Sequence, residues 1–182
     1  PASVLEADIL PARLEAYHTS DLDELCSAGE VVWRGVESIG AHDGRIVVAL
    51  AEHASLLPGA EQPLCESLQQ QIIDVLGERG ALYFDEIVTE IGGFSQELLQ
   101  HLWELVWRGL VTNDTLAPLR SLWRAAGGES KRRRRGQRRY RSRRTQRRPG
   151  TEGRWSLFET RPAFTPTERQ TALASQLVER YG

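Results

Sequence analysis

Apolar residues recur at helical spacing in the middle of the chain. Over residues 95–108 they fall on one face of a helix: Leu98, Leu99, Leu102, Leu105 and Val106. Ser95 is a suitable N-cap, and Gly109 can adopt the left-handed conformation that ends a helix. Residues 110–112 then favour extended chain. The pattern predicts a helix that passes through a glycine directly into a short strand.

A similar pattern occurs 80 residues earlier in the chain. Residues 22–32 match residues 102–112 at five of eleven positions, including the two glycines. A second similarity relates residues 43–50 to residues 152–158, so that Gly44-Arg45 corresponds to Gly153-Arg154 at an offset of 109. We therefore predict two tandem copies of a helix, strand, turn and strand, with about 29 residues inserted in the second copy. Chance similarity between two helix ends is the alternative.

The same spacing arguments predict the other elements. In the first half they are the end of a helix (3–10) broken by Pro11, a helix (21–28) capped by Thr19 or Ser20, strands 31–36 and 45–50 around a turn (40–44), and a boundary at 56–63. In the second half they are helices 64–78, 83–91 and 116–126, the last interrupted early by Pro118, a glycine turn at 92–94, a strand (154–158) and a helix from 165 to 180.

This order of elements predicts an α+β fold, mainly α, of tandem winged helix-turn-helix modules with small two-stranded wings. Residues 1–57 would be the second half of one module. Residues 64–160 would form a second module whose wing holds an arginine-rich insertion at about 116–152. Residues 165–182 would begin a following, truncated module. The absence of Met and the apparent helix at the end indicate a fragment of a longer polypeptide.

Charge is distributed very unevenly along the chain. The net charge is −2, but residues 131–148 hold 12 of the 23 basic residues and no acidic one. The rest of the chain is therefore acidic, and attraction to phosphate must come mainly from this run. Because the run is Gly-flanked and offers nothing apolar to bury, residues 127–150 are predicted to be disordered on their own.

The basic run is the candidate nucleic-acid contact. Its guanidinium groups suit phosphate, and Tyr140 could stack on a base of single-stranded or RNA-like targets. The alternative is a solvated segment that tunes solubility or meets an acidic partner. The candidate binding residues are Lys131, Arg132, Arg133, Arg134, Arg135, Arg138, Arg139, Tyr140, Arg141, Arg143, Arg144, Arg147, Arg148 and Arg154.

The helix at 95–108 stands where a winged helix places its recognition helix, but its side chains fit that role poorly. Glu97 and Glu104 would repel phosphates, although Gln96, Gln100, His101 and Arg108 share the polar face. Trp103 and Trp107 lie on or beside the apolar stripe, so we interpret them as core or inter-module packing rather than as base-stacking residues.

Motifs for other chemistry are not found. The sequence has no phosphate-binding GxxxxGK[ST], no GxGxxG and no Cys or His pair at metal-ligand spacing, so it predicts no catalytic residue and no metal site. The four histidines are scattered, and Asp85, Glu86 and Glu90 are expected on a solvated face. Cys26 and Cys65 are expected to be buried, reduced thiols. No signal peptide or long apolar run is visible, which indicates a soluble, cytoplasmic protein.

Six segments of the chain together resemble a known family. LPARLEAY, LDELCSAGEVVWRG, DGRIVVAL, LWELVWRGLVTNDTLAPLR, GRWSLF and TERQTALASQLVERYG are similar to the C-terminal region of the large helicase-related (Lhr) bacterial ATP-dependent helicases. The resemblance covers nearly the whole chain apart from the basic run. It implies a parent with motor domains that bind ATP and Mg²⁺, followed by an array of winged helices and a β-barrel. That array resembles one in winged-helix DNA glycosylases, and uracil-DNA glycosylase activity is attributed to this region in some relatives.

The sequence therefore leads to three hypotheses. The first is a DNA-binding or scaffold segment of an Lhr-like DNA-repair helicase, with DNA, RNA or an RNA–DNA hybrid and the remaining domains of the parent as partners, and no membrane. The second is an array that helps to form a base-excision site, although glycosylase motifs are not identifiable here. The third is an interaction module that binds no DNA.

Overall fold

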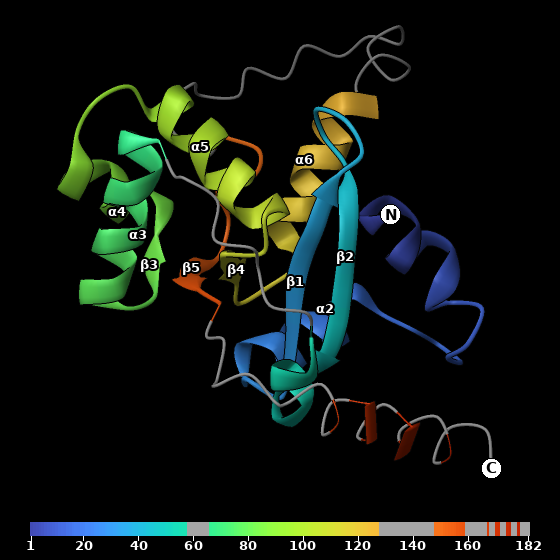
Figure 1. Ribbon diagram of the computed structural model, residues 1–182. Coiled ribbons are helices and arrows are strands. Elements are labelled where there is room, and N and C mark those ends of the chain that lie inside the picture. Colours follow the sequence, from blue (N-terminus) through green and yellow to red (C-terminus); the bar gives the residue numbers. More distant parts are fainter. Residues whose placement is uncertain are drawn as a thin grey trace, which may run out of the picture.

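The computed structural model describes residues 1–57, 66–127 and 148–158, together with six separate positions: Thr167, Gln170, Thr171, Ala174, Ser175 and Val178. Helices predominate over two small antiparallel sheets (Figure 1). The helices are α1 (Ala2–Val4), the π-helix η1 (Leu5–Ile9), α2 (Thr19–Ser27), the 3₁₀-helix η2 (Ala51–Leu56), α3 (Ser67–Arg79), α4 (Phe84–Ile91), α5 (Ser95–Trp107) and α6 (Ala117–Gly127). The strands are β1 (Val31–Ser38), β2 (Gly44–Leu50), β3 (Leu82–Tyr83), β4 (Val111–Asn113) and β5 (Arg154–Leu157).

The repeat predicted from the sequence has the same backbone geometry at both sites. Both Gly29 and Gly109 have a left-handed φ, of +75° and +71°. At each helix end the residue after the glycine donates its amide to a carbonyl five residues earlier, from Glu30 to Leu25 and from Leu110 to Leu105. This is the Schellman arrangement, which satisfies the last carbonyls of the helix and turns the chain into a strand. The matched sequences therefore encode matched local structures.

Each of the two caps leads into a pair of antiparallel strands. β1 pairs with β2 in a long hairpin, from Val31 opposite Leu50 to Ser38 opposite Gly44. β4 pairs with β5 over three residues. The second sheet also contains β3, which pairs with β5, so its order is β3–β5–β4. The β4–β5 pair is two-stranded, as expected for the second wing, but its sheet contains a third strand that was not predicted. β3 has only two residues and forms by pairing with a strand far along the chain.

Several predicted helix boundaries are also corrected. Phe94, not Ser95, is the N-cap of α5, since its carbonyl already accepts the amide of Leu98. α2 begins at Thr19 rather than at residue 21, and its N-cap His18 donates its amide to the Asp21 carboxylate. Pro118 does not interrupt α6. It lies in the first turn, where the missing amide has no partner to lose.

The predicted helix at 64–78 begins in the structure at Ser67. The predicted module boundary at 56–63 and the predicted C-terminal helix at 165–180 lie largely outside the described residues. The short strand predicted at 154–158 is confirmed as β5 and ends one residue earlier, at Leu157.

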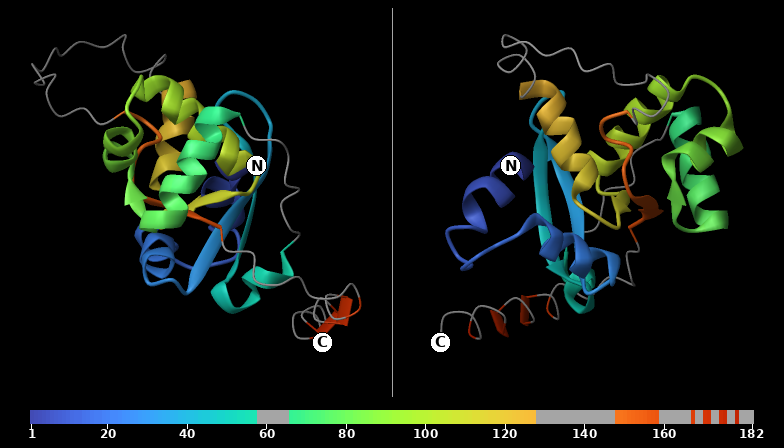
Figure 2. Two further views of the ribbon diagram at one scale, coloured as in Figure 1. Left: turned by 60° about the vertical axis from the view of Figure 1, so that its left-hand side comes forward. Right: turned by 180° about the vertical axis from the view of Figure 1, so that it is seen from behind.

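Helix α5 lies at the centre of the described residues, between the α3–α4 pair and the β1–β2 hairpin (Figures 1 and 2). The hairpin packs closely on α5: a Cβ at Gly35 would lie 2.0 Å from the carbonyl oxygen of Val106. Trp33, which is fully buried, donates its indole N–H to the Thr115 carbonyl at 3.1 Å. Residues on both sides of the gap at 58–65 therefore contribute to one hydrophobic core.

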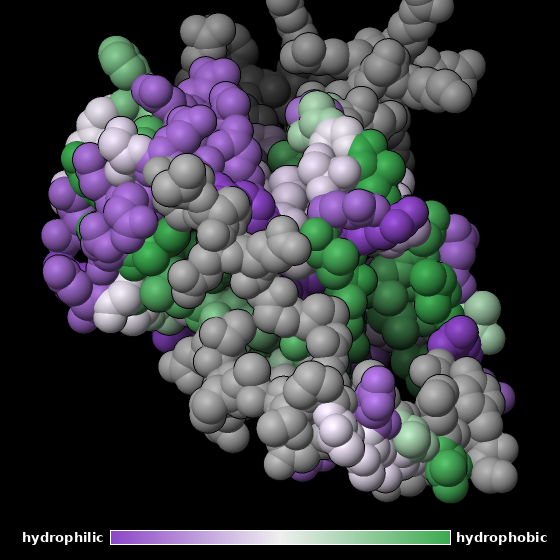
Figure 3. Space-filling view, in the orientation of Figure 1, coloured by the Kyte–Doolittle hydropathy of each residue, from purple (hydrophilic) through white to green (hydrophobic). Residues whose placement is uncertain are grey.

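The surface of the molecule differs from one side to the other. Figure 3 shows mainly hydrophilic residues over the α3, α4 and α5 side and apolar residues gathered over the β1–β2 hairpin. Val36 and Leu50 on the hairpin are each about half exposed. In the described part of the chain, no helix has the length and apolar character needed to cross a bilayer.

Candidate nucleic-acid interface

The C-terminal half of the polar face of α5 makes contacts within the protein. Glu104 accepts hydrogen bonds from Gln69 on α3 at 2.8 Å and from Gln100 at 3.1 Å, and His101 lies 3.1 Å away. Arg108 donates to the Gln69 amide oxygen at 2.6 Å. Burial opposes ionisation of Glu104, but these hydrogen bonds and the neighbouring imidazole outweigh it and lower the pKa of the carboxyl. The network joins α5 to α3 and keeps a carboxylate where a recognition helix would present donors to DNA.

The tryptophans of α5 are core residues, as the sequence predicted. Trp103 and Trp107 are 6 % and 8 % exposed, and their ring centroids lie 5.2 Å apart. Trp103 also meets the fully buried Trp155 of β5 edge to face, with centroids 5.5 Å apart. This geometry is favourable for aromatic pairs and ties α5 to the second sheet. Neither ring of α5 is available for stacking on a base.

The chain that follows the basic run is fixed to α5 and α6 at Gly150. The Gly150 carbonyl accepts the indole N–H of Trp103 at 3.2 Å. Its amide donates to the Ser121 hydroxyl on α6 at 2.6 Å and to the Glu152 carboxylate at 3.0 Å. Ser121 in turn donates to Glu152 at 2.7 Å. Gly150 has a φ of +83°, and a Cβ there would lie 2.8 Å from the indole nitrogen. Only glycine fits this position without strain.

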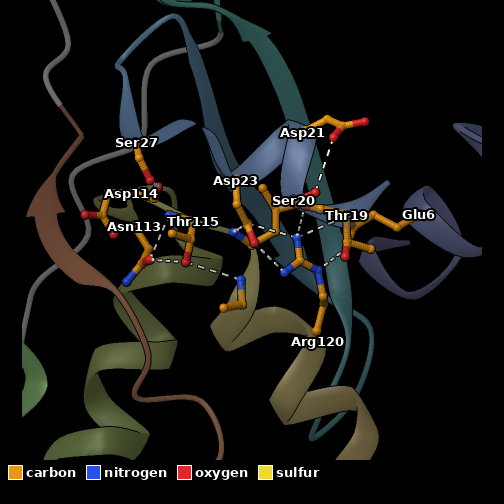
Figure 4. Close-up of polar contacts among 12 residues, drawn as sticks. Glu6, Thr19, Ser20, Asp21, Asp23, Ser27, Asn113, Asp114, Thr115 and Arg120 are labelled. Carbon is orange, nitrogen blue, oxygen red and sulfur yellow. Dashed lines mark hydrogen bonds and ion pairs between the residues drawn. The ribbon is translucent and has the colours of Figure 1, made fainter. Parts of the chain in front are cut away.

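The chain that precedes the basic run is fixed through Arg120 of α6. Its guanidinium contacts Glu6 of η1 at 2.5 Å and Asp23 of α2 at 2.7 Å (Figure 4). It also donates to the Thr19 carbonyl at 3.1 Å, and Tyr17 donates to Glu6 at 2.6 Å. The three charged side chains are between 12 % and 25 % exposed. Two carboxylates and their hydrogen bonds raise the pKa of Arg120 in spite of its burial, so the cation is retained.

The candidate residues from Lys131 to Arg147 lie outside the described residues. Two members of the predicted set can be placed. Arg148 is exposed and lies two residues before Gly150. Its carbonyl accepts a hydrogen bond from the Thr151 hydroxyl at 2.8 Å. Arg154 at the start of β5 pairs with Asp114 at 2.8 Å, and this pairing raises the pKa of its half-exposed guanidinium. Arg154 therefore already has an anionic partner within the protein.

Other predicted features can be checked in the described part. Asp85, Glu86 and Glu90 are exposed, as expected for a solvated face. Cys26 is buried and free, and burial raises the pKa of its thiol to about 11. Cys65 lies outside the described residues. The described residues contain no group of three or more His, Cys, Asp or Glu side chains arranged to hold a metal ion.

Some residues that shape this region were not found from the sequence. Arg120 and Glu6 are 114 positions apart, and Ser121 and Glu152 are 31 apart, so no local spacing connects them. Arg34 was also missed: it is buried, donates to the Gly109 carbonyl at 3.0 Å and lies 5.2 Å over the Phe158 ring. The sequence signal for the attachment at Ser121 was Gly150, because a glycine stands there between the basic run and a predicted strand.

A family model matches the first part of the chain, and two known proteins match all of it. A family model described as the winged-helix domain of large helicase-related protein matches residues 1–51. The "Lhr helicase/uracil glycosylase" of Escherichia coli (strain K12) is 38 % identical over 201 aligned residues that cover the whole chain. The "Lhr helicase/ probable uracil glycosylase" of Mycolicibacterium smegmatis is 38 % identical over 199 aligned residues, again covering all of it.

The chain spans 13 % of the length of each of these two relatives, so it corresponds to a small part of either protein. The matches confirm the resemblance that the sequence segments indicated. The chain is therefore similar to a segment of the large helicase-related (Lhr) helicases, consistent with their C-terminal region.

Proposed function

We propose that the chain is a nucleic-acid-binding and scaffold segment of an Lhr-like ATP-dependent DNA-repair helicase. In this proposal it contacts the DNA backbone through the arginine-rich run at 131–148, without sequence specificity. Support comes from the helicase names of relatives that match the whole chain and from the 12 basic residues gathered in the run. Contacts from guanidinium groups to phosphate supply affinity but carry no base information.

The observation that carries the proposal is that both chain segments flanking the run are fixed to α6. On the N-terminal side the run follows α6, which Arg120 holds against Glu6 and Asp23. On the C-terminal side Gly150 is bonded to Ser121 of the same helix. In the sequence the run lies between β4 and β5, which pair with each other, and in this proposal it is an extension of that wing. The described residues on the two sides of the run therefore both belong to the folded part of the chain.

The state of α5 supports a backbone contact rather than a reading of bases. Glu104 and the C-cap residue Arg108 bond to Gln69 of α3, and the tryptophans of α5 lie in the core. We therefore assign no base-reading role to the helix that occupies the recognition position. Its part in the proposal is to support the strands from which the run extends.

The tandem arrangement of modules is part of the proposal. Residues 1–57 would be the second half of one winged helix, residues 64–160 a complete one, and residues 165–182 the start of another. The helix, glycine cap and strand pair that occur twice support it, as does the order α3, β3, α4, α5, β4, α6, β5, in which α6 lies between the two strands. ATP and Mg²⁺ would be bound by motor domains elsewhere in the longer protein, which we place in the cytoplasm.

The test removes the charge of the run and leaves the hydrogen bonds of Gly150 with Trp103 and Ser121 intact. One variant replaces residues 131–147 with a short Gly-Ser linker, and a second replaces the 11 basic residues among them with Gln at constant length. Binding to labelled single-stranded and duplex DNA is measured by anisotropy over a range of salt concentrations. Wild-type affinity should fall with salt at a log–log slope of about −5 or steeper, and the slope should become shallower than about −2 in both variants.

Matched substitutions show where the affinity arises. Gln96→Ala on the exposed face of α5 should change affinity less than about twofold, and Arg154→Ala should have a small effect because Asp114 already neutralises that charge. An unchanged salt slope in the all-Gln variant would overturn the role of the run. RNA and an RNA–DNA hybrid of the same length, used as competitors, establish the preferred target.

Two other functions correspond to distinct outcomes. If the wild-type chain binds no nucleic acid at low salt, the interaction-module hypothesis is correct, and the engaged polar face of α5 would be a packing surface. The relatives are named as helicase and uracil glycosylase, so the chain is also incubated with uracil-containing single strands. Uracil release that is lost on substitution within residues 1–182 would support a part in base excision.

A further inference from the structure

Trp123 differs from the other tryptophans in its exposure. It is 46 % exposed, whereas Trp33, Trp103, Trp107 and Trp155 are each 8 % exposed or less. All five lie in the described part of the chain. Trp123 stands near the C-terminal end of α6, eight residues before the basic run begins. An indole exposed to solvent at this place contributes little to the core and needs another explanation.

The indole borders a surface cleft. Trp123 and Arg124 line it from α6, His42 from the turn of the β1–β2 hairpin, and Ala2 and Ser3 from α1. Figures 1 and 2 show the end of α6 beside the turn of the hairpin and the N-terminal helix. The cleft thus provides an aromatic face with cationic or titratable side chains on two sides.

The carboxylates of the cleft are already engaged. Asp43 accepts the amide and hydroxyl of Ser3, at 3.2 and 2.5 Å, and the amide of Gly44 at 2.9 Å. Glu6 is paired with Arg120. In contrast, Arg124 is exposed and has no hydrogen bond or ion pair among the described residues. The cation available to an incoming anion is therefore next to the exposed indole.

The basic run is attached to the same helix. It is separated from the end of α6 by three residues, and the returning chain bonds to Ser121, two residues from Trp123. Whatever polyanion the run binds is thereby concentrated near this indole. Of the polyanions, only single-stranded nucleic acid also carries unpaired aromatic bases, which every sequence can offer for stacking.

We propose that Trp123 is a stacking platform for an unpaired base of single-stranded nucleic acid, with Arg124 contacting the adjacent phosphate. The inference rests on the proposed function, since the basic run supplies most of the affinity. It adds a preference that charge alone does not give: a base in a duplex is already stacked on its neighbours, so the platform favours single strands. Single-strand binding by an aromatic residue beside a cationic groove is a general arrangement.

The experiment compares Trp123→Ala and Trp123→Phe in the full chain, with fluorescein-labelled oligothymidylate of 20 nucleotides and a 20-base-pair duplex as probes. Phe94→Ala is the matched control, because Phe94 is another exposed aromatic residue, in the turn before α5. Trp123→Ala should weaken oligothymidylate binding about 5- to 30-fold and duplex binding less than twofold. Trp123→Phe should retain affinity within about threefold, and Phe94→Ala should have no effect.

Two further readouts separate stacking from charge. Trp123→Ala should leave the slope of log affinity against log salt unchanged, whereas Arg124→Ala should make it shallower by about 0.7 for a single strand. Stacking on thymine should also quench the fluorescence of wild-type Trp123, and this quenching should disappear in Trp123→Phe. This readout remains valid because it does not require the variant to lose stability.

The outcomes distinguish this inference from the function on which it rests. If Trp123→Ala binds oligothymidylate like the wild type while the all-Gln run does not, the stacking role fails and the proposed function stands. An equal loss for single-stranded and duplex probes also overturns the stacking role. A wild-type chain that binds neither probe overturns both. If Trp123→Ala instead abolishes self-association in sedimentation, the cleft belongs to a second copy of the chain and the inference is wrong.

Discussion

Trp103 of α5 donates its indole N–H to the carbonyl of Gly150, 3.2 Å away and 47 residues later in the chain. This bond joins the central helix to the point where the chain returns from the basic run. The ring and the glycine are closely matched, because a Cβ at Gly150 would contact the indole nitrogen. The bond therefore couples the position of the wing to the packing of the core.

Gly150→Ala is expected to destabilise the fold more than a comparable glycine substitution without the clash. Gly93 also has a left-handed φ, of +85°, but a Cβ there would meet nothing within 4 Å. Gly93→Ala should therefore cost about 1 kcal/mol from backbone strain alone. Gly150→Ala should cost about 1–3 kcal/mol more, since the indole must move. Urea unfolding monitored by circular dichroism measures both, and equal losses would contradict a tight fit at Gly150.

Removal of Arg120 is expected to leave two largely buried carboxylates without their partner. Arg120→Ala should therefore lower the free energy of unfolding by about 3 kcal/mol or more. The matched control is Arg154→Ala, which breaks an ion pair whose guanidinium is 48 % exposed and which should cost less than about 1 kcal/mol. Thermal unfolding of the two variants compares the pairs. A loss for Arg120→Ala no larger than that for Arg154→Ala would show that α6 is held by other contacts.

A methyl group at Gly35 is expected to separate the hairpin from α5. Its Cβ would overlap the carbonyl of Val106, which is backbone and cannot swing away. Gly35→Ala should cost about 1–3 kcal/mol or more. Gly77 in α3 is the control, since a Cβ there would lie 3.6 Å from Leu157 at ordinary contact distance. Gly77→Ala should stabilise the helix by about 0.5–1 kcal/mol. Chemical denaturation of both variants should therefore give changes in the free energy of unfolding that have opposite signs.

Cys26 is expected to make stability depend on pH in the alkaline range. Burial raises the pKa of its thiol to about 11 in the folded chain, so between pH 9 and 11 the unfolded chain loses a proton that the folded chain keeps. The free energy of unfolding should therefore fall as pH rises through this window. A Cys65→Ser chain shows the effect, and the Cys26→Ala, Cys65→Ser chain should show a smaller fall, which remains because burial also raises the pKa of Tyr17. Rapid reaction of Cys26 with a thiol reagent at pH 8 would contradict the burial.

The features predicted correctly from the sequence are those with local causes. The left-handed cap at Gly109 follows from residue type at the end of an apolar periodicity and is confirmed, and Gly29, its match in the repeat, has the same conformation. The burial of Trp103 and Trp107 follows from their place on the apolar stripe. Such signals lie within one or two turns of helix, so a single sequence is sufficient to find them.

The features that were missed depend on partners far away in the chain. Two residues at 82–83 form a strand only because β5 is beside them, and no pattern of two positions can predict that. The burial of Arg34 and Arg120 is possible because a carbonyl and two carboxylates from other segments meet their guanidinium groups. In the candidate site, the basic run was visible in the composition, but its attachment through Ser121 and Gly150 required the structure.

The contact of Trp33 with Thr115 also bears on how the chain can be divided. The family model ends at residue 51, yet the carbonyl that accepts the indole N–H of Trp33 comes from Thr115, and Trp33 shares one core cluster with residues of α5. A recombinant piece that stops near residue 57 would present this tryptophan to water. The end of the family match is thus not an edge of the hydrophobic core, which continues from residues 1–51 into the elements packed around α5.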